Sequence, residues 1–369
     1  MDKQIEWIPL PGYPIEGGIS APYIGVHKEK LIVAGGCNFP DIPAARGGEK
    51  VFYKSLYLLD ISTDRKGDRW KKGKDLPYEV AYGSSVNTDK GIICIGGQNK
   101  SSALSDVLLI QYDEELNDVT FASLPSLPAK VFNADASIDN NKVYVTGGIN
   151  SNHEKGAIYI LNLDELQNGW FTIKASAIYE RQQPVVIAQD NQLFIAGGYD
   201  EKEAKVFTDI SRFDFKSNQW DTYADIISGN QEISTFIGAG GISYQSGYIL
   251  FVGGVNYECF TSALQRIRKT REASEAGNLE LVDSLKQAGK EYMNQDIGWY
   301  KFNPSLSLFN IHTKKWDFLG DYRQAARAGA GITIWKDELY VICGELKPGI
   351  RTSEANYAKL EIKNETGKQ

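Results

Sequence analysis

The sequence predicts an all-β protein, a six-bladed β-propeller that forms one domain over residues 1–369. Three observations indicate this fold: apolar runs that end in Gly-Gly, tryptophans spaced after these runs, and an aromatic content of 11% with only 2 Met. Gly-Gly pairs begin at positions 35, 96, 147, 197 and 253, so neighbouring pairs are 50 to 61 residues apart. That spacing has room for the four short strands of a propeller blade.

Each apolar run is expected to form the second strand of its blade. Two glycines at the end of such a strand adopt unusual dihedral angles and let backbones approach closely near the propeller axis. In a sixth run, Leu339–Glu345, Glu345 stands where the second glycine is expected. The five regular runs are Leu31–Gly36, Ile92–Gly97, Val143–Gly148, Leu193–Gly198 and Ile249–Gly254.

The outer strands are marked by tryptophans, and the whole pattern resembles the kelch repeat. The last unit provides only three strands, and Ile5–Leu10, with Trp7 at the tryptophan position, is expected to supply the fourth. The ring then closes by pairing the N- and C-terminal strands, which leaves no open sheet edge. The other outer-strand tryptophans are Trp70, Trp170, Trp220 and Trp316, and the last unit's own strands are Gly329–Ile334, Leu339–Cys343 and Tyr357–Ile362.

The interval between the fifth and sixth runs contains an insertion at about residues 260–303. Its centre is rich in good helix formers, so we expect a packed helix that covers a patch of the propeller. Because the insertion begins shortly after a Gly-Gly pair, it should form a wall or lid over one mouth of the central channel. Apolar residues recur at helical spacing at Leu281, Val282, Leu285, Ala288 and Tyr292.

Composition excludes several classes of ligand. A net charge of −7 argues against nucleic acid as a partner, and no apolar stretch reaches the roughly 18 residues of a membrane span. The cysteines lack zinc-ligand spacing and the histidines fall in separate blades, so we expect neither a metal nor another cofactor. The residues concerned are Cys37, Cys94, Cys259, Cys343, His27, His153 and His312.

The loops that follow Gly-Gly should all lie at one mouth of the channel, together with the segments between blades. Four of these loops carry an asparagine, which is either a turn former that tolerates left-handed dihedrals or a ligand contact. The asparagines are Asn38, Asn99, Asn150 and Asn256, and the segments between blades carry Tyr82, Phe132, Arg181, Glu232 and Arg327.

Glu345 is expected to enter the same mouth, followed on its loop by Lys347 and Arg351. A carboxylate in a narrow, partly apolar funnel suits general acid/base catalysis, and a neighbouring cation suits an anionic substrate. A salt bridge between Glu345 and Arg351 that only fastens the loop explains the same residues equally well. Both interpretations stay open on the residues alone.

The segment Gly344–Thr352, with the sequence GELKPGIRT, resembles a signature of the kelch-type N-acetylneuraminate epimerases, the sialic acid mutarotases. In that family the motif reads Gly-Glu-x-Lys-Pro-Gly-x-Arg-Thr. A second similarity is the FVGGVNYECF run before the helical insertion. In typical members the Gly-Glu blade lies mid-chain, so this sequence resembles a cyclically permuted branch.

The resemblance implies an isomerase that interconverts the α and β anomers of N-acetylneuraminate without a cofactor, with Glu345 and Arg351 as the catalytic pair. Its expected substrate-binding residues are Lys347, Arg181, Arg327, Asn38, Asn256 and Tyr82, although both arginines suit a structural role equally. The alternative is a non-catalytic kelch module that binds carbohydrate or protein. The family implies the periplasm, but residues 1–7 show no signal peptide, which leaves the cytoplasm open; we expect a monomer or a homodimer.

Overall fold

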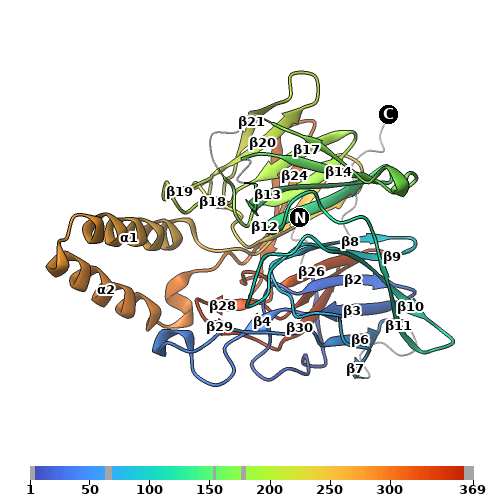
Figure 1. The fold of residues 1–369 in the computed structure, drawn as a ribbon, viewed down its shortest axis with the longest axis horizontal. Helices are drawn as coiled ribbons and strands as arrows, with labels where there is room; N and C mark the ends of the chain where they lie inside the picture. The colour runs from blue at the N-terminus through green and yellow to red at the C-terminus, as the bar shows by residue number, and fades with distance from the viewer. Residues whose placement is uncertain (1–4, 63–68, 153–154, 176–179, 361–369) are drawn as a thin grey trace.

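The computed structural model describes residues 5–62, 69–152, 155–175 and 180–360. Six four-stranded antiparallel sheets form the six blades of a propeller, as predicted. The first strand of each blade faces the axis, because these six strands contact one another in a closed circle. The predicted helical insertion lies between the second and third strands of blade 5 (Figure 1).

The blades follow the chain from the inner to the outer strand. Blade 1 contains β2 (Tyr23–His27), β3 (Lys30–Ala34), β6 (Leu56–Asp60) and β7 (Lys71–Lys72); blade 2 contains β8 (Ser84–Thr88), β9 (Gly91–Ile95), β10 (Val107–Asp113) and β11 (Asp118–Ser123); blade 3 contains β12 (Val131–Asp139), β13 (Lys142–Asn150), β14 (Ile158–Asn162) and β15 (Trp170–Ile173). Blade 4 contains β16 (Val185–Gln189), β17 (Gln192–Ala196), β20 (Asp209–Asp214) and β21 (Gln219–Asp225); blade 5 contains β22 (Gly240–Tyr244), β23 (Tyr248–Val252), β24 (Ser305–Asn310) and β25 (Lys315–Asp321).

Blade 6 joins the two ends of the chain, as predicted. It contains β26 (Gly331–Trp335), β27 (Glu338–Ile342), β30 (Ala355–Lys359) and, as its outer strand, β1 (Trp7–Leu10). β1 pairs antiparallel with β30, and Trp7 lies opposite Ala358. The predicted third strand of this blade extended to position 362, of which residues 361 and 362 lie outside the described residues.

Short elements lie in the loops between strands, most of them after the second strand of a blade. Within the described residues, three two-stranded ribbons follow second strands: β4 (Cys37–Asn38) with β5 (Val51–Phe52), β18 (Tyr199–Asp200) with β19 (Lys205–Val206), and β28 (Glu345–Lys347) with β29 (Ile350–Arg351). Single 3₁₀ turns lie at η1 (Ala44–Arg46), η2 (Leu166–Asn168) and η3 (Ile297–Tyr300).

Three of the outer-strand tryptophans link their blade to the one before it, whereas the indole N–H of Trp7 is buried without a partner within the described residues. Trp70 Nε1 donates to the carbonyl of Pro11 at 2.8 Å, Trp170 Nε1 to that of Pro125 at 2.7 Å, and Trp316 Nε1 to that of Asp225 at 3.1 Å. Each of these three indoles therefore packs its ring against apolar neighbours and pairs its only donor across the blade interface. This dual contact explains why tryptophan recurs in the repeat.

The insertion differs from the single packed helix that the sequence predicted. It is a hairpin of α1 (Tyr257–Glu275) and α2 (Leu279–Met293), which stands out from the propeller beside β18–β19 and β28–β29 (Figure 1). Gly277, at φ 69°, ends the first helix, and Asn278 caps the second by accepting a hydrogen bond from the N–H of Leu281 at 3.1 Å. A left-handed glycine followed by an asparagine cap is a helix stop and start.

The inward face of α2 also differs in part from the predicted one. Val282 is buried and Leu285 and Tyr292 are half-buried, whereas Leu281 and Ala288 are exposed. α1 is fixed to the β18–β19 loop of blade 4, because Arg271 donates to the carbonyl of Lys202 at 2.7 Å. Among the described residues no helix combines the length with the apolar composition needed to span a bilayer.

Candidate active site

The sixth Gly-Gly position is one residue earlier than the sequence predicted. The second strand of a blade ends at Ala34 in blade 1 and at Ile342 in blade 6, so Cys343 takes the place of the first glycine and Gly344 that of the second. Cys343 has φ 57° against 70° for Gly35, and Gly344 has φ 104° against 89° for Gly36. The glycine that was replaced is therefore at Cys343, and Glu345 occupies an ordinary extended position after the pair.

Glu345 and Arg351 face each other across the β28–β29 ribbon, which places their charged groups together. Arg351 Nη1 lies 3.0 Å from Glu345 Oε1, and the N–H of Gly349 donates to the same oxygen at 2.8 Å. In the described part of the chain both contacts fall on Oε1, and Oε2 has no hydrogen bond. The salt bridge expected as one interpretation is therefore present, and one carboxylate oxygen stays available to a ligand.

The Arg351 side chain is only 4% exposed and is held on several sides. Its Nε donates to Ser20 Oγ at 3.1 Å, and its guanidinium carbon lies 4.9 Å from the centre of the Phe39 ring. Nη1 is buried and, despite its closeness to Glu345, makes no well-aligned hydrogen bond within the described residues. A rigid cation with unused N–H groups is suited to a carboxylate ligand.

Both residues line a cavity of about 1080 Å³ at the mouth of the central channel. The inner strands and the segments before them form its base, and both insertion helices line its side through residues such as Phe260, Arg266 and Tyr292. The insertion is thus a wall of this mouth, as predicted. Lys50 and Arg266 add positive charge to the lining, which counteracts the negative field of the whole chain near the pair.

Tyr82 lies on the same cavity wall, next to blade 1. Its hydroxyl accepts hydrogen bonds from Lys50 Nζ at 2.7 Å and from Cys37 Sγ at 3.3 Å. Burial, followed by the nearby Cys37 and Glu345, raises the pKa of Tyr82 well above its usual value, while Arg351 opposes the rise. The phenol therefore stays protonated at neutral pH, and its own proton remains available for donation.

Six residues, one from each blade, form a closed ring of backbone hydrogen bonds around the propeller axis, and all six line the cavity. Each donates its N–H to the carbonyl of its counterpart in the preceding blade at 2.7–3.2 Å, and each has a positive φ between 50° and 66°. We call them the ring residues. In order of blades 1 to 6 they are Ala21, Tyr82, Asn133, Gln183, Gly238 and Gly329.

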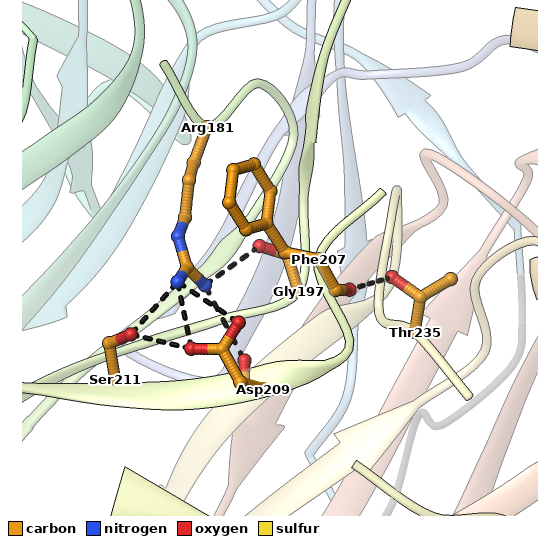
Figure 2. Close-up of polar contacts among 6 residues, drawn as sticks. All are labelled: Arg181, Gly197, Phe207, Asp209, Ser211 and Thr235. Carbon is orange, nitrogen blue, oxygen red and sulfur yellow. Dashed lines mark hydrogen bonds and ion pairs between the residues drawn. The ribbon is translucent and has the colours of Figure 1, made fainter. Parts of the chain in front are cut away.

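The two arginines between blades lie outside this cavity. Figure 2 shows Arg181 against Asp209 and Ser211, with Nη2 donating to Asp209 Oδ2 and to Ser211 Oγ at 2.8 Å each. Arg327 is 1% exposed and donates to the carbonyl of Cys343 at 2.9 Å and to a carboxylate oxygen of Glu354 at 2.6 Å. Both side chains run into the blade walls, which matches the structural role left open for them.

Lys347 also points away from the cavity lining, toward the base of the insertion. Its Nζ donates to the carbonyl of Gln295 at 2.6 Å and lies 5.9 Å from the centre of the Tyr300 ring. It therefore fastens the β28–β29 ribbon to the end of the helical hairpin. Its predicted contact with a substrate is not a feature of this arrangement.

The loop asparagines serve local structure. Asn38 is buried, donates to the carbonyl of Gly18 at 2.9 Å and accepts from the hydroxyl of Tyr53 at 2.7 Å. Asn256 lines the cavity but caps α1, because its Oδ1 accepts from the N–H of Cys259 at 2.9 Å. Asn99 and Asn150 likewise accept hydrogen bonds from backbone N–H groups two residues ahead in the chain.

Sequence reasoning missed Asn133 and Gln183, which line the cavity, and selected the neighbouring Phe132 and Arg181 instead. In five blades the ring residue stands two positions before the inner strand, as Gln183 does before Val185. Aligning the inner strands rather than the Gly-Gly pairs would have found this position. His153 lies outside the described residues; within those residues, no three His, Cys, Asp or Glu side chains gather closely enough to hold a metal ion.

Comparison with known proteins identifies the family. The family profile of N-acetylneuraminate epimerase matches residues 2–119 and 124–369. Proteins named N-acetylneuraminate epimerase from Haemophilus influenzae (strain PittEE) and Vibrio vulnificus (strain YJ016) are each 27% identical, over 71% and 67% of this chain and 65% and 63% of their own lengths. The matched part thus spans less than two thirds of these relatives.

A solved structure titled "Structure of YjhT" resembles the whole propeller. It has a TM-score of 0.59 and 17% sequence identity, and the match covers 94% of this chain and 96% of the other. At this identity the likeness concerns the fold. The match to the family profile over nearly all residues shows that the chain belongs to the N-acetylneuraminate epimerase family.

Proposed function

We propose that this protein is a sialic acid mutarotase that interconverts the α and β anomers of N-acetylneuraminate. One observation carries the proposal: Glu345 and the buried Arg351, 3.0 Å apart, both line the large cavity at the channel mouth. The family's name supports the substrate, and the site supplies an acid/base group beside a cation. A sugar acid with a hydroxyl and a carboxylate on its anomeric carbon needs both.

The chemistry requires only proton transfers. Glu345 Oε2 accepts the proton of the anomeric hydroxyl, the bond between the anomeric carbon and the ring oxygen breaks, and its electron pair stays on the ring oxygen. The phenol of Tyr82 protonates that oxygen, which leaves an open-chain ketone. Rotation about the bond to the carbonyl carbon exposes its other face, and reclosure reverses both transfers and gives the other anomer.

Arg351 holds the sugar carboxylate in this proposal. Its unused N–H groups can form a charge-assisted, two-point contact, and the Phe39 ring and Ser20 keep the guanidinium in one orientation. Fixing the carboxylate also fixes the adjacent anomeric carbon near Glu345, because the two carbons are directly bonded. Positioning of this kind accounts for much of the rate of a reaction that needs no covalent intermediate.

Saturation-transfer NMR of N-acetylneuraminate measures anomer exchange directly. Glu345→Gln should lower the exchange rate by about 100-fold or more, and Arg351→Lys should chiefly raise the KM because lysine lacks the two-point fork. Glu49→Gln, an exposed glutamate outside the cavity, is the matched control and should keep the wild-type rate. Full exchange by the Glu345 variant would remove that residue from the mechanism. No exchange by the wild-type protein would instead favour the non-catalytic module.

A further inference from the structure

The ring residues give the cavity a second group of polar side chains besides the charged pair. Ring residues with polar side chains come from three successive blades: Tyr82, Asn133 and Gln183. The other three ring residues, Ala21, Gly238 and Gly329, have no polar side chain. The ring therefore carries polar side chains on three successive blades and none on the other three.

Asn133 lies across the ring from Gly329, beside which the backbone of Glu345 joins blade 6. Glu345 is joined to blade 6 beside Gly329, because the N–H of Glu345 donates to the carbonyl of Ala328 at 2.8 Å. Counting along the hydrogen-bonded ring, Gly329 is followed by Ala21, Tyr82 and then Asn133. Three steps around a ring of six reach the opposite side.

The amides of Asn133 and Gln183 are uncommitted within the described residues. Asn133 Oδ1 is buried and has no hydrogen-bond partner, and neither amide takes part in a side-chain hydrogen bond there, although both residues line the cavity. A buried polar atom without a partner costs free energy. A ligand that pairs with these amides would recover that cost.

The backbone conformation of the ring makes every residue other than glycine costly there. Gly238 and Gly329 adopt the left-handed ring conformation without strain, whereas Gln183 at φ 50° and Tyr82 at φ 61° adopt it at a cost. Glycine would fit every ring position better on conformational grounds. Asn133, at φ 55°, belongs to the residue type that tolerates this region best after glycine.

We propose that Asn133, assisted by Gln183, binds the substituent at carbon 5 of the sugar and so selects an acetamido group there. The inference rests on the proposed mutarotase function. With the carboxylate on Arg351 and the anomeric carbon 2 near Glu345, carbon 5 lies on the far side of the six-membered ring, toward Asn133. An amide side chain donates to the acetamido carbonyl and accepts from its N–H, which a hydroxyl group does not reproduce.

The test compares two sugar acids in the saturation-transfer assay: N-acetylneuraminate and its analogue with a hydroxyl at carbon 5. Asn133→Gly should lower kcat/KM for the acetamido sugar about tenfold and change that for the hydroxyl analogue much less, so that the wild-type preference is lost. Ala21→Gly is the matched control, since it alters the same ring position in blade 1 without removing a polar group. Asn133→Asp, which keeps the tolerance for left-handed dihedrals, should also lose the preference and serves if the glycine variant melts early.

The outcomes separate the two proposals. If the wild-type protein exchanges the acetamido sugar and both Asn133 variants keep its preference, the assignment of Asn133 is overturned and the mutarotase stands. If the wild-type protein exchanges neither sugar, the proposed function falls, and the assignment falls with it.

Discussion

The buried arginines near the channel mouth differ in role. Arg351 faces the cavity with Nη1 free of a well-aligned hydrogen bond within the described residues. The terminal nitrogens of Arg181 and Arg327 instead donate to carbonyl and carboxylate oxygens in the blade walls, although Arg327 Nε is buried without a partner among those residues. The difference follows from position, because residues between blades precede the ring and point into the interface. A buried arginine that satisfies carbonyl groups stabilises the fold rather than a ligand.

This distinction predicts unequal effects for two arginines that share one partner. Arg327 and Arg323 both contact Glu354, at 2.6 Å and 3.0 Å, but their side chains are 1% and 72% exposed. Arg327→Ala should lower the free energy of unfolding by about 3 kcal/mol, because it leaves buried carbonyl groups unpaired. Arg323→Ala should cost less than about 1 kcal/mol. Urea titrations of both variants measure the difference, and equal losses would contradict the structural role of Arg327.

The position of the replaced glycine in the sixth run could not be found from the sequence pattern alone. The sequence singled out Glu345 correctly as a feature of the channel mouth, but as a replaced glycine. The strand ends at Ile342, so the replaced glycine is Cys343, a non-glycine residue at φ 57°. The sequence does not reveal which residue is the last of the strand, because the pairing with neighbouring strands determines where the strand ends.

Among the elements, the helical hairpin departs most from its prediction. Helix formers and spacing indicated helix correctly, and the position after Gly-Gly placed it at the mouth. The break at Gly277 and Asn278 was readable as a stop and a cap, whereas the way the hairpin stands out depends on anchors distant in sequence. These are Arg271 on the blade 4 loop and Lys347 on the blade 6 ribbon.

The Lys347 anchor gives a prediction for the hairpin. Lys347→Met keeps the apolar stem but removes the donor to Gln295, so the base of the hairpin should open more often. Limited proteolysis with an enzyme that does not cut at lysine should cleave within residues 257–293 several times faster. Lys290→Met, an exposed lysine of α2, is the matched control. Unchanged cleavage in the Lys347 variant would show that other contacts hold the hairpin.

At the scale of the whole molecule, the repeat made the blade number, the closure through β1 and β30 and the site of the mouth predictable. The ring residues were not predictable in this way, because their role arises only when six segments 50 to 91 residues apart in the sequence meet around one axis. Asn133 has no motif of its own. The cyclic permutation inferred from the order of the blades, the oligomeric state and the compartment stay predictions.

The most direct measurement is a crystal structure of the Glu345→Gln variant with N-acetylneuraminate. We expect the sugar in the cavity, with its carboxylate within about 3 Å of the Arg351 guanidinium, its anomeric hydroxyl beside residue 345 and its acetamido group toward Asn133. A carboxylate bound away from Arg351, or a sugar bound outside the channel mouth, would contradict the proposed mechanism.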